Sequence, residues 1–115
     1  MQVHLAHPRV SWTPLDESNL DRLVERLETR LDPRVSEDAE LELCVRAQRG
    51  GRLQATAQLR ARGRTIRTRA EAWDTVEIVD AVEDGLLRQI RRLNRVPKAS
   101  RRRLRDAFGR TPLPA

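Results

Sequence analysis

Two neighbouring stretches of the chain alternate between apolar and polar residues, and this pattern constrains the fold more than any other feature. In residues 41–47 and again in residues 53–61, every second residue is Leu, Val or Ala, and most residues between them are polar or charged. Because successive side chains of a β-strand point to opposite faces, this period of two predicts two strands that each bury one face. The Gly50-Gly51 pair between the stretches predicts a hairpin turn.

Two shorter segments carry the same pattern. Val3 and Leu5 alternate with polar neighbours and predict a short first strand. Residues 65–70 follow a turn signal at Gly63 and predict a strand after the hairpin. Together with the two longer stretches, these segments predict four strands.

Apolar residues at helical spacing predict two helices. The first runs from Thr13, a typical N-cap residue, to Asp32. The second runs from Asp74, another typical N-cap residue, to Pro97, because proline cannot continue a helix. Each helix has one apolar stripe, so each is expected to bury one side.

Two tryptophans and one glycine are expected to have structural roles. Trp12 and Trp73 each directly precede a predicted N-cap, so we expect both to pack rather than to stack on bases, Trp73 against Ile78. Gly85 lies inside the second helix, where glycine costs about 1 kcal/mol relative to alanine. Close packing on a neighbouring element is the expected reason for this glycine.

The predicted element order is strand, helix, three strands, helix, which defines an α+β fold. The last three strands can form an antiparallel meander, and the first helix can cross over to place the first strand parallel to the second. We therefore expect residues 1–96 to form a four-stranded mixed sheet with two helices packed on one face. Residues 97–115 are expected to be a basic C-terminal segment, either a short helix or disordered.

Charged residues are separated into blocks of one sign. Residues 43–70 hold eight arginines and no acid, residues 71–84 hold six acids and no base, and residues 88–105 hold nine bases and no acid. The formal net charge is +6, and every basic residue except Lys98 is arginine, whose planar guanidinium suits phosphate groups. Because like charges repel, two cationic blocks of this length favour a polyanionic partner such as RNA.

The arginines of the cationic blocks are the predicted RNA-binding residues. The predicted sheet contains no aromatic residue, so recognition is expected to depend on phosphate groups and RNA shape rather than on base identity. The strands, the second helix and the C-terminal segment contribute Arg60, Arg62, Arg67, Arg69, Arg88, Arg91, Arg92, Arg95, Arg101, Arg102 and Arg103.

Composition argues against several other functions. Cys44 is the only cysteine, which excludes an intramolecular disulfide and a thiolate zinc cluster. His4 and His7 have no nearby carboxylate or thiol in the sequence, and no phosphate-binding glycine loop is present. We therefore expect no enzymatic activity, no cofactor, no metal and no small-molecule substrate. No apolar run approaches the ~20 residues of a membrane span, and a signal-peptide pattern is lacking, so the expected location is the cytoplasm, without a membrane partner.

These segments together resemble the short ribosome hibernation promoting factor and ribosome-associated inhibitor family over residues 1–95. Residues 70–80, with Trp73-Asp74 at their centre, resemble the family's Ala-x-Gly-x-Asp-Met-Tyr-x-Ala-Ile-Asp start of its last helix. Arg88-Gln89 resembles the basic segment of that helix, and Arg26-Leu27-Glu28 resembles a Lys-Leu-Glu of the first helix.

The chain departs from the family pattern at several places, including the Pro97 break and the Arg101-Arg102-Arg103 run. Thr75-Val76 stands where the family has Met-Tyr, and Gly85 replaces a basic residue in the middle of the last helix. The extra dimerisation domain of the family's long form is not expected in this protein.

The resemblance implies a bacterial, ribosome-associated translation regulator of the stress response. Such a protein would occupy the messenger and transfer-RNA channel of the small ribosomal subunit and silence idle ribosomes. It implies small-subunit rRNA as the partner and adds Arg26 to the predicted RNA-binding residues. Without the dimerisation domain, the protein is expected to be monomeric away from the ribosome.

Two other interpretations are compatible with the sequence. The acidic first helix and the acidic residues 71–84 fit a regulator that binds a basic protein. The basic C-terminal segment fits a non-specific binder of nucleic acid or of an anionic membrane, although the scarcity of aromatic residues disfavours the membrane.

Overall fold

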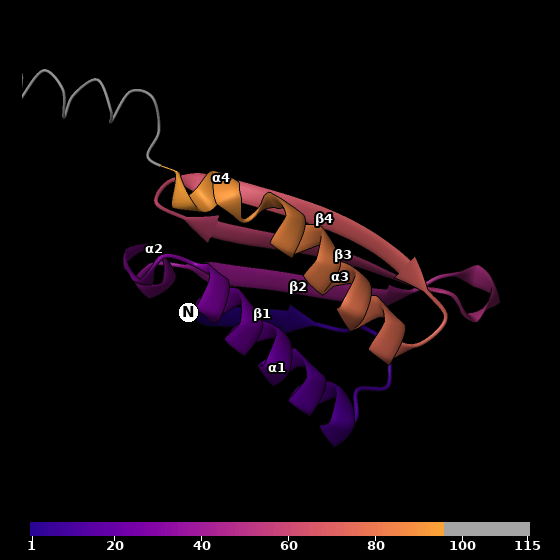
Figure 1. The fold of residues 1–115 in the computed structure, drawn as a ribbon. Helices are drawn as coiled ribbons and strands as arrows, with labels where there is room; N and C mark the ends of the chain where they lie inside the picture. The colour runs from indigo at the N-terminus through magenta and orange to yellow at the C-terminus, as the bar shows by residue number, and fades with distance from the viewer. Residues whose placement is uncertain (96–115) are drawn as a thin grey trace, which may run out of the picture.

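Residues 1–95, the part of the chain that the computed structural model describes, form a four-stranded sheet covered by helices on one face (Figure 1). The predicted α+β fold with a four-stranded mixed sheet is confirmed. Residues 97–115, predicted as a basic C-terminal segment, lie outside the described residues. The elements in chain order are β1 (Gln2–Ala6), α1 (Pro14–Arg30), α2 (Pro33–Glu37), β2 (Glu40–Ala47), the 3-10 turn η1 (Arg49–Gly51), β3 (Leu53–Ala61), β4 (Arg64–Ala72), α3 (Thr75–Gln89) and α4 (Arg91–Asn94).

The strands lie in the sheet in the order in which they follow in the chain, β1-β2-β3-β4. β1 is parallel to β2, and the other neighbouring pairs are antiparallel. The parallel pair requires a crossover, which α1 provides. The turns predicted at glycines are confirmed. Gly50 and Gly51 have φ of 84° and 83° after β2, and Gly63 has φ of 73° before β4, a region that glycine adopts without strain.

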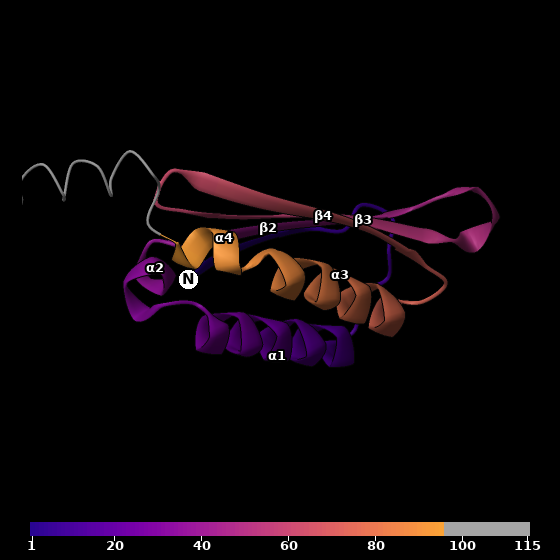
Figure 2. The same cartoon turned by 45° about the horizontal axis from the view of Figure 1, so that its top comes forward.

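The two layers meet along the apolar face of the sheet, and Figure 2 shows α1 and α3 on the same side of it. The opposite, outer face carries mainly polar and charged residues and is largely open to solvent. This one-sided burial follows from the period of two in the strands. The largest fully buried side chains come from both layers: Leu23, Leu27, Leu41, Leu43, Leu59, Ile66, Ile78, Leu86, Leu93, Val35, Val45 and Val82. No helix in residues 1–95 is both long and apolar enough to cross a bilayer.

The helices differ from the predicted ranges at their C-terminal ends. α1 ends at Arg30, and Asp32 begins the short helix α2 by accepting a hydrogen bond from the Arg34 N–H (3.0 Å). The second predicted helix is not continuous but breaks at Ile90 into α3 and α4. The pattern does not reveal this break because Ile90 and Leu93 are both buried and continue the apolar stripe across it.

The two tryptophans have different environments. Trp12 is half-buried against the core, as predicted, and its indole N–H donates a hydrogen bond to Glu17 (2.8 Å). Trp73 is 66% exposed, so the predicted packing of its ring on Ile78 is wrong. Ile78 is completely buried in the core, whereas the Trp73 ring lies beside the guanidinium of Arg52.

A buried carboxylate connects the start of α1 to the start of α3. Asp16 accepts hydrogen bonds from the backbone N–H of Thr13, the N-cap of α1 (2.9 Å), and from the hydroxyl of Thr75, the first residue of α3 (2.5 Å). Burial by itself would raise the pKa of Asp16, but the hydrogen bonds from Thr13 and Thr75 outweigh it and lower this pKa below its ordinary value. The carboxylate is therefore ionised at neutral pH.

Gly85 marks a close approach between α3 and β4. A Cβ atom at Gly85 would overlap with Oγ1 of Thr68 on β4 and would lie 2.8 Å from its Cβ. The predicted reason for this glycine, close packing on a neighbouring element, is confirmed. The helix can approach the strand this closely only because position 85 has no side chain.

Replacing Asp16 with alanine should lower the free energy of unfolding by about 1–3 kcal/mol at neutral pH, because the Thr13 N–H and the Thr75 hydroxyl lose their acceptor. The folded pKa of Asp16 is lower than its ordinary value of 3.8. Its contribution is therefore complete above that pH and is lost as the pH falls through the folded pKa. Urea unfolding of wild type and variant at neutral and acidic pH measures this difference. An equal difference at both pH values would contradict the assignment.

Replacing Gly85 with alanine should lower the free energy of unfolding by about 1–3 kcal/mol through overlap with Thr68. Helix propensity alone predicts the opposite, a gain of about 1 kcal/mol. Urea unfolding distinguishes the two results. Adding Thr68→Ala, which removes Oγ1 and Cγ2, should restore part of the loss, and a G85A protein more stable than wild type would refute the close approach.

Candidate nucleic-acid interface

The helix α4 carries Arg91 and Arg92, and its other two residues attach it to the domain. Leu93 is buried in the core. Asn94 donates a hydrogen bond from Nδ2 to the Arg30 carbonyl (3.0 Å) and accepts one at Oδ1 from the Asp32 N–H (2.8 Å). Because these two backbone groups lie at the end of α1, where the helix leaves its own groups unpaired, Asn94 fixes α4 to α1.

Further contacts attach α3 and α4 to β4. Arg64, the first residue of β4, donates from Nη1 to the carbonyl of Arg92 (2.5 Å) at the C-terminal end of α4. Gln89, the last residue of α3, donates from Nε2 to the carbonyl of Arg67 on β4 (2.6 Å). The break at Ile90 therefore lies between a helix end bound to β4 and a short helix bound to both α1 and β4.

The arginines on this fixed segment point into solvent. Arg88, Arg91, Arg92 and Arg95 are all exposed. Within residues 1–95, none of them forms an ion pair with a carboxylate. Arg88 in the last turn of α3 and Arg95 at the C-cap of α4 are placed favourably, because the helix dipole is negative at a C-terminal end.

A second group of arginines belongs to β4 and the turn before it. Arg67 and Arg69 are exposed on the outer face, opposite Gln58 and Thr56 of β3. Arg62 is exposed in the turn that joins β3 to β4. No carboxylate of the described residues pairs with any of these three guanidiniums.

The two groups meet at the open edge of β4, where Gln89 binds the Arg67 carbonyl. α3 and α4 lie on the inner side of this strand, and Arg67 and Arg69 project on the outer side. We refer to the combined set as the β4 arginine surface. It consists of Arg62, Arg67, Arg69, Arg88, Arg91, Arg92 and Arg95.

Arg26, a predicted RNA-binding residue, is held in an ion pair between helices. Its Nη1 donates to both carboxylate oxygens of Glu83 on α3, each at 2.8 Å, and Glu83 is only 7% exposed. The hydrogen bond to Glu83, together with the charge of that carboxylate, raises the pKa of Arg26 above its ordinary value. Removing one partner of such a pair would leave a buried charge, so we assign Arg26 to the scaffold.

Arg60 was also predicted as an RNA-binding residue, and the structure pairs it with acids of β2. Its Nη2 lies 2.5 Å from Glu42 and 3.5 Å from Glu40. In the register Glu40 lies directly opposite Arg60, and Glu42 lies diagonally opposite it, so both carboxylates are within reach. The charge of Arg60 is therefore neutralised, and we do not include it in the β4 arginine surface. Arg101, Arg102 and Arg103 lie outside the described residues.

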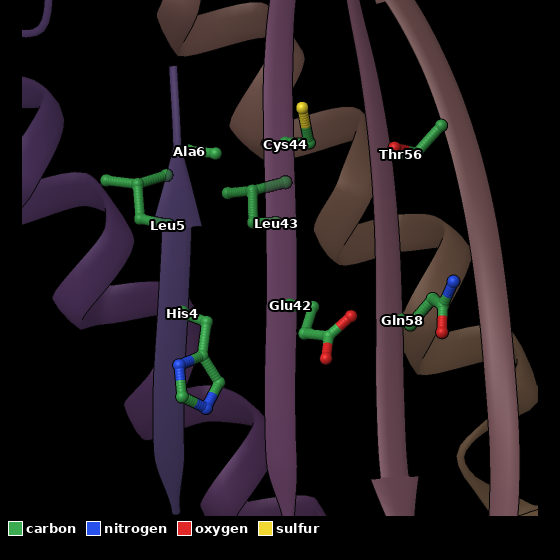
Figure 3. A pocket seen from close by; sticks show the side chains of 8 residues that line it. All are labelled: His4, Leu5, Ala6, Glu42, Leu43, Cys44, Thr56 and Gln58. Atoms are coloured by element: carbon green, nitrogen blue, oxygen red, sulfur yellow. The ribbon is translucent and has the colours of Figure 1, made fainter. Parts of the chain in front are cut away.

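The β1–β2 side of the outer face differs from the β4 side. A hollow of about 260 Å³ lies there, and Figure 3 shows the His4, Glu42, Cys44 and Gln58 side chains among those that line it. His4 lies beside Glu42 in the parallel pair of strands. Among residues 1–95, no group of three or more His, Cys, Asp and Glu side chains is placed to hold a metal ion.

The sequence alone did not assign a positioning role to Arg64, Gln89 or Asn94. Arg64, Gln89 and Asn94 act through side-chain hydrogen bonds to backbone carbonyls far away in the chain. A backbone carbonyl is present at every residue, so such a contact leaves no pairing pattern in the sequence. Only the fold brings these groups together.

No known protein family model and no curated protein matches this sequence. The fold, in contrast, is similar to solved structures. A ribosomal subunit interface protein from Coxiella burnetii has a TM-score of 0.60 at 20% identity, over 80% of this chain and 96% of that chain. The N-terminal domain of Protein Y from Thermus thermophilus has a TM-score of 0.67 at 19% identity, over 80% of this chain and 98% of that chain. The resemblance predicted from the sequence is thus confirmed in the fold.

Replacing Asn94 with alanine should release α4 locally without unfolding the domain. Each lost hydrogen bond contributes about 0.5–1.5 kcal/mol. Amide hydrogen exchange should therefore become faster at Leu93 and Arg95, while the amides in the middle of α3 keep their protection. Unchanged exchange at Leu93 and Arg95 would show that Asn94 does not hold α4.

Proposed function

We propose that this protein is a ribosome-associated translation inhibitor of the hibernation promoting factor type, which binds small-subunit rRNA through the β4 arginine surface. One observation carries the proposal: seven predicted RNA-binding arginines border a single strand, and none has a carboxylate partner in residues 1–95. The shared fold with a ribosomal subunit interface protein and with the Protein Y domain supports the ribosome as the partner.

Electrostatics favours a phosphate backbone as the ligand. Guanidiniums that lie close together without acids repel one another, and a polyanion removes this repulsion while its own counterions are released. Negative charge remains away from the surface: Glu40 and Glu42 on β2 are separated from β4 by β3, and the single guanidinium of Arg60 offsets only one of these two carboxylates. This polarity would orient the protein with β4 towards RNA as it approaches.

The mechanism proposed for inhibition is occupancy. Because α4 is fixed to α1 and β4, its arginines are held in place before binding, which reduces the entropy lost on association. A folded domain bound to small-subunit rRNA by its β4 side would exclude messenger and transfer RNA sterically. This mode of action needs no cofactor or small-molecule substrate, and it fits a monomer in the cytoplasm.

The proposal includes the arginines of the C-terminal segment. Arg101, Arg102 and Arg103 follow the last described arginine, Arg95, within a few residues of chain. We propose that they supply additional phosphate contacts. Their removal would then weaken binding and reduce its salt dependence, whereas the domain would still bind.

The test compares two charge-reversed variants. Arg88→Glu with Arg92→Glu changes the β4 arginine surface, and Arg9→Glu with Arg22→Glu changes two exposed arginines elsewhere. Each substitution lowers the charge by two, so both variants go from +6 to +2. The first variant should lose co-sedimentation with small ribosomal subunits, and the second should retain most of it.

Circular dichroism and thermal unfolding serve as controls that both variants remain folded. If both variants lose binding equally, net charge alone governs association and the β4 arginine surface has no special role. If wild type binds duplex DNA as tightly as it binds subunits, the protein is a general nucleic-acid binder. If the protein still co-sediments after the subunits have been treated with nuclease, its partner is a protein. That outcome would favour a regulator that binds a basic protein through its acidic helix surfaces.

A further inference from the structure

Trp73 is the most exposed large apolar residue among those described, and no role assigned so far involves it. It is 66% exposed, compared with 61% for Leu15, 44% for Val76 and 37% for Val3. An indole ring in water loses the stabilisation that burial would give it. Aromatic residues that remain exposed on a fixed backbone are characteristic of binding sites, because the ring offers a large contact area.

Trp73 is the first residue after β4, and Figure 1 shows that β4 ends on the side of the sheet remote from α4. Trp73 lies beyond the last paired residue of the strand, Ala72, and its place near the outer face follows from its neighbour Arg52. Arg52 places its guanidinium carbon 5.9 Å from the ring centroid and pairs with Glu71 on that same face (3.2 Å). One side of the ring thus faces Arg52, and the exposure of the residue leaves the remainder accessible.

The backbone at Trp73 is fixed from both directions. Before it, Ala72 pairs with Leu53 in the sheet. After it, Asp74 caps α3 by accepting a hydrogen bond from the Glu77 N–H (2.8 Å), and the Glu77 carboxylate accepts one from the Trp73 N–H (3.4 Å). The ring therefore projects from a rigid junction, and a ligand that stacks on it would restrict few additional backbone motions.

Trp73 follows a row of outward-facing residues on β4. Arg67, Arg69 and Glu71 are spaced at about 7 Å along the strand, and Trp73 lies two residues beyond Glu71. Arg52 neutralises Glu71, so the row presents two unpaired guanidiniums followed by an aromatic ring. A nucleic-acid strand that runs along β4 could place phosphates beside Arg67 and Arg69 and a base against Trp73.

We propose that Trp73 stacks on an unpaired nucleobase of a single-stranded RNA segment that crosses the outer face of the sheet. The inference rests on RNA as the proposed partner and adds the kind of RNA element that is bound. It also replaces the expectation that only phosphates and shape are recognised. Stacking on tryptophan tolerates any sequence, because every base has a π face.

The surroundings of Trp73 favour RNA over a protein partner. Arg46, which shares a cross-strand row with Glu71, and Arg49 in η1 are exposed and form no ion pair with a carboxylate in the described part of the chain. A protein-binding patch would require a continuous apolar area. The other exposed apolar residues nearby, Leu15 and Val76, lie in the first turns of α1 and α3 and thus belong to the helix layer.

The test uses fluorescence, since Trp12 and Trp73 are the only tryptophans in the chain. In the Trp12→Phe protein, emission reports on Trp73 alone. Titration with a short oligouridylate should quench this emission to saturation. At constant salt concentration, Trp73→Leu should weaken oligouridylate binding by about 5- to 150-fold, the range for loss of one stacked base. Trp73→Phe, which keeps a π face, should retain most of the affinity.

An RNA duplex of the same length is the control ligand, and its affinity should be equal for wild type and Trp73→Leu, because its bases are paired. Absence of quenching, or equal oligouridylate affinity of wild type and Trp73→Leu, would overturn the inference. Wild-type co-sedimentation with small subunits would still support the proposed function in that case. If Trp73→Leu loses subunit binding but keeps its oligouridylate affinity, Trp73 contacts a protein and the inference is wrong.

Discussion

The close contact between α3 and β4 determines where the unpaired arginines lie. Gly85 allows the helix to approach Thr68, and the end of the helix then lies near enough for Gln89 to reach the Arg67 carbonyl. β4 is an edge strand, and the Gln89 side chain rather than a further strand binds its Arg67 carbonyl. The arginines of β4 also disfavour the addition of a strand from another protein chain. The same contact places the arginines of α3 and α4 next to those of the sheet.

Ion pairs divide the arginines of this chain into two groups. Arg26 connects α1 to the buried Glu83 of α3, and Arg60 lies between two glutamates of β2, so both contribute to the scaffold. The arginines along β4 have no such partner in residues 1–95, and their mutual repulsion opposes folding. A polyanionic ligand would relieve that repulsion, which links the charge pattern to the proposed partner.

Elements that depend on neighbouring residues could be predicted from the sequence. The strands followed from alternation, the helix starts followed from Thr13 and Asp74, and Gly85 indicated close packing before any partner was known. The candidate site was predicted less completely. Arg67, Arg69 and the arginines of the second helix are exposed, but the pairs of Arg26 and Arg60 could not be inferred, because each partner lies far away in the chain. The exposure of Trp73 was missed for a related reason, since position before an N-cap does not fix the direction of a ring.

The α+β class, the buried face of each strand and the separation of charge into blocks are all evident from the order of the amino acids. These properties depend on local geometry, in which side chains alternate along a strand and recur along a helix. Tertiary structure alone decided which arginines keep their charge available, where the second helix breaks, and which residues hold α4 in place. Those outcomes depend on distances between groups that are remote in sequence, and such distances become defined only when the two layers pack together.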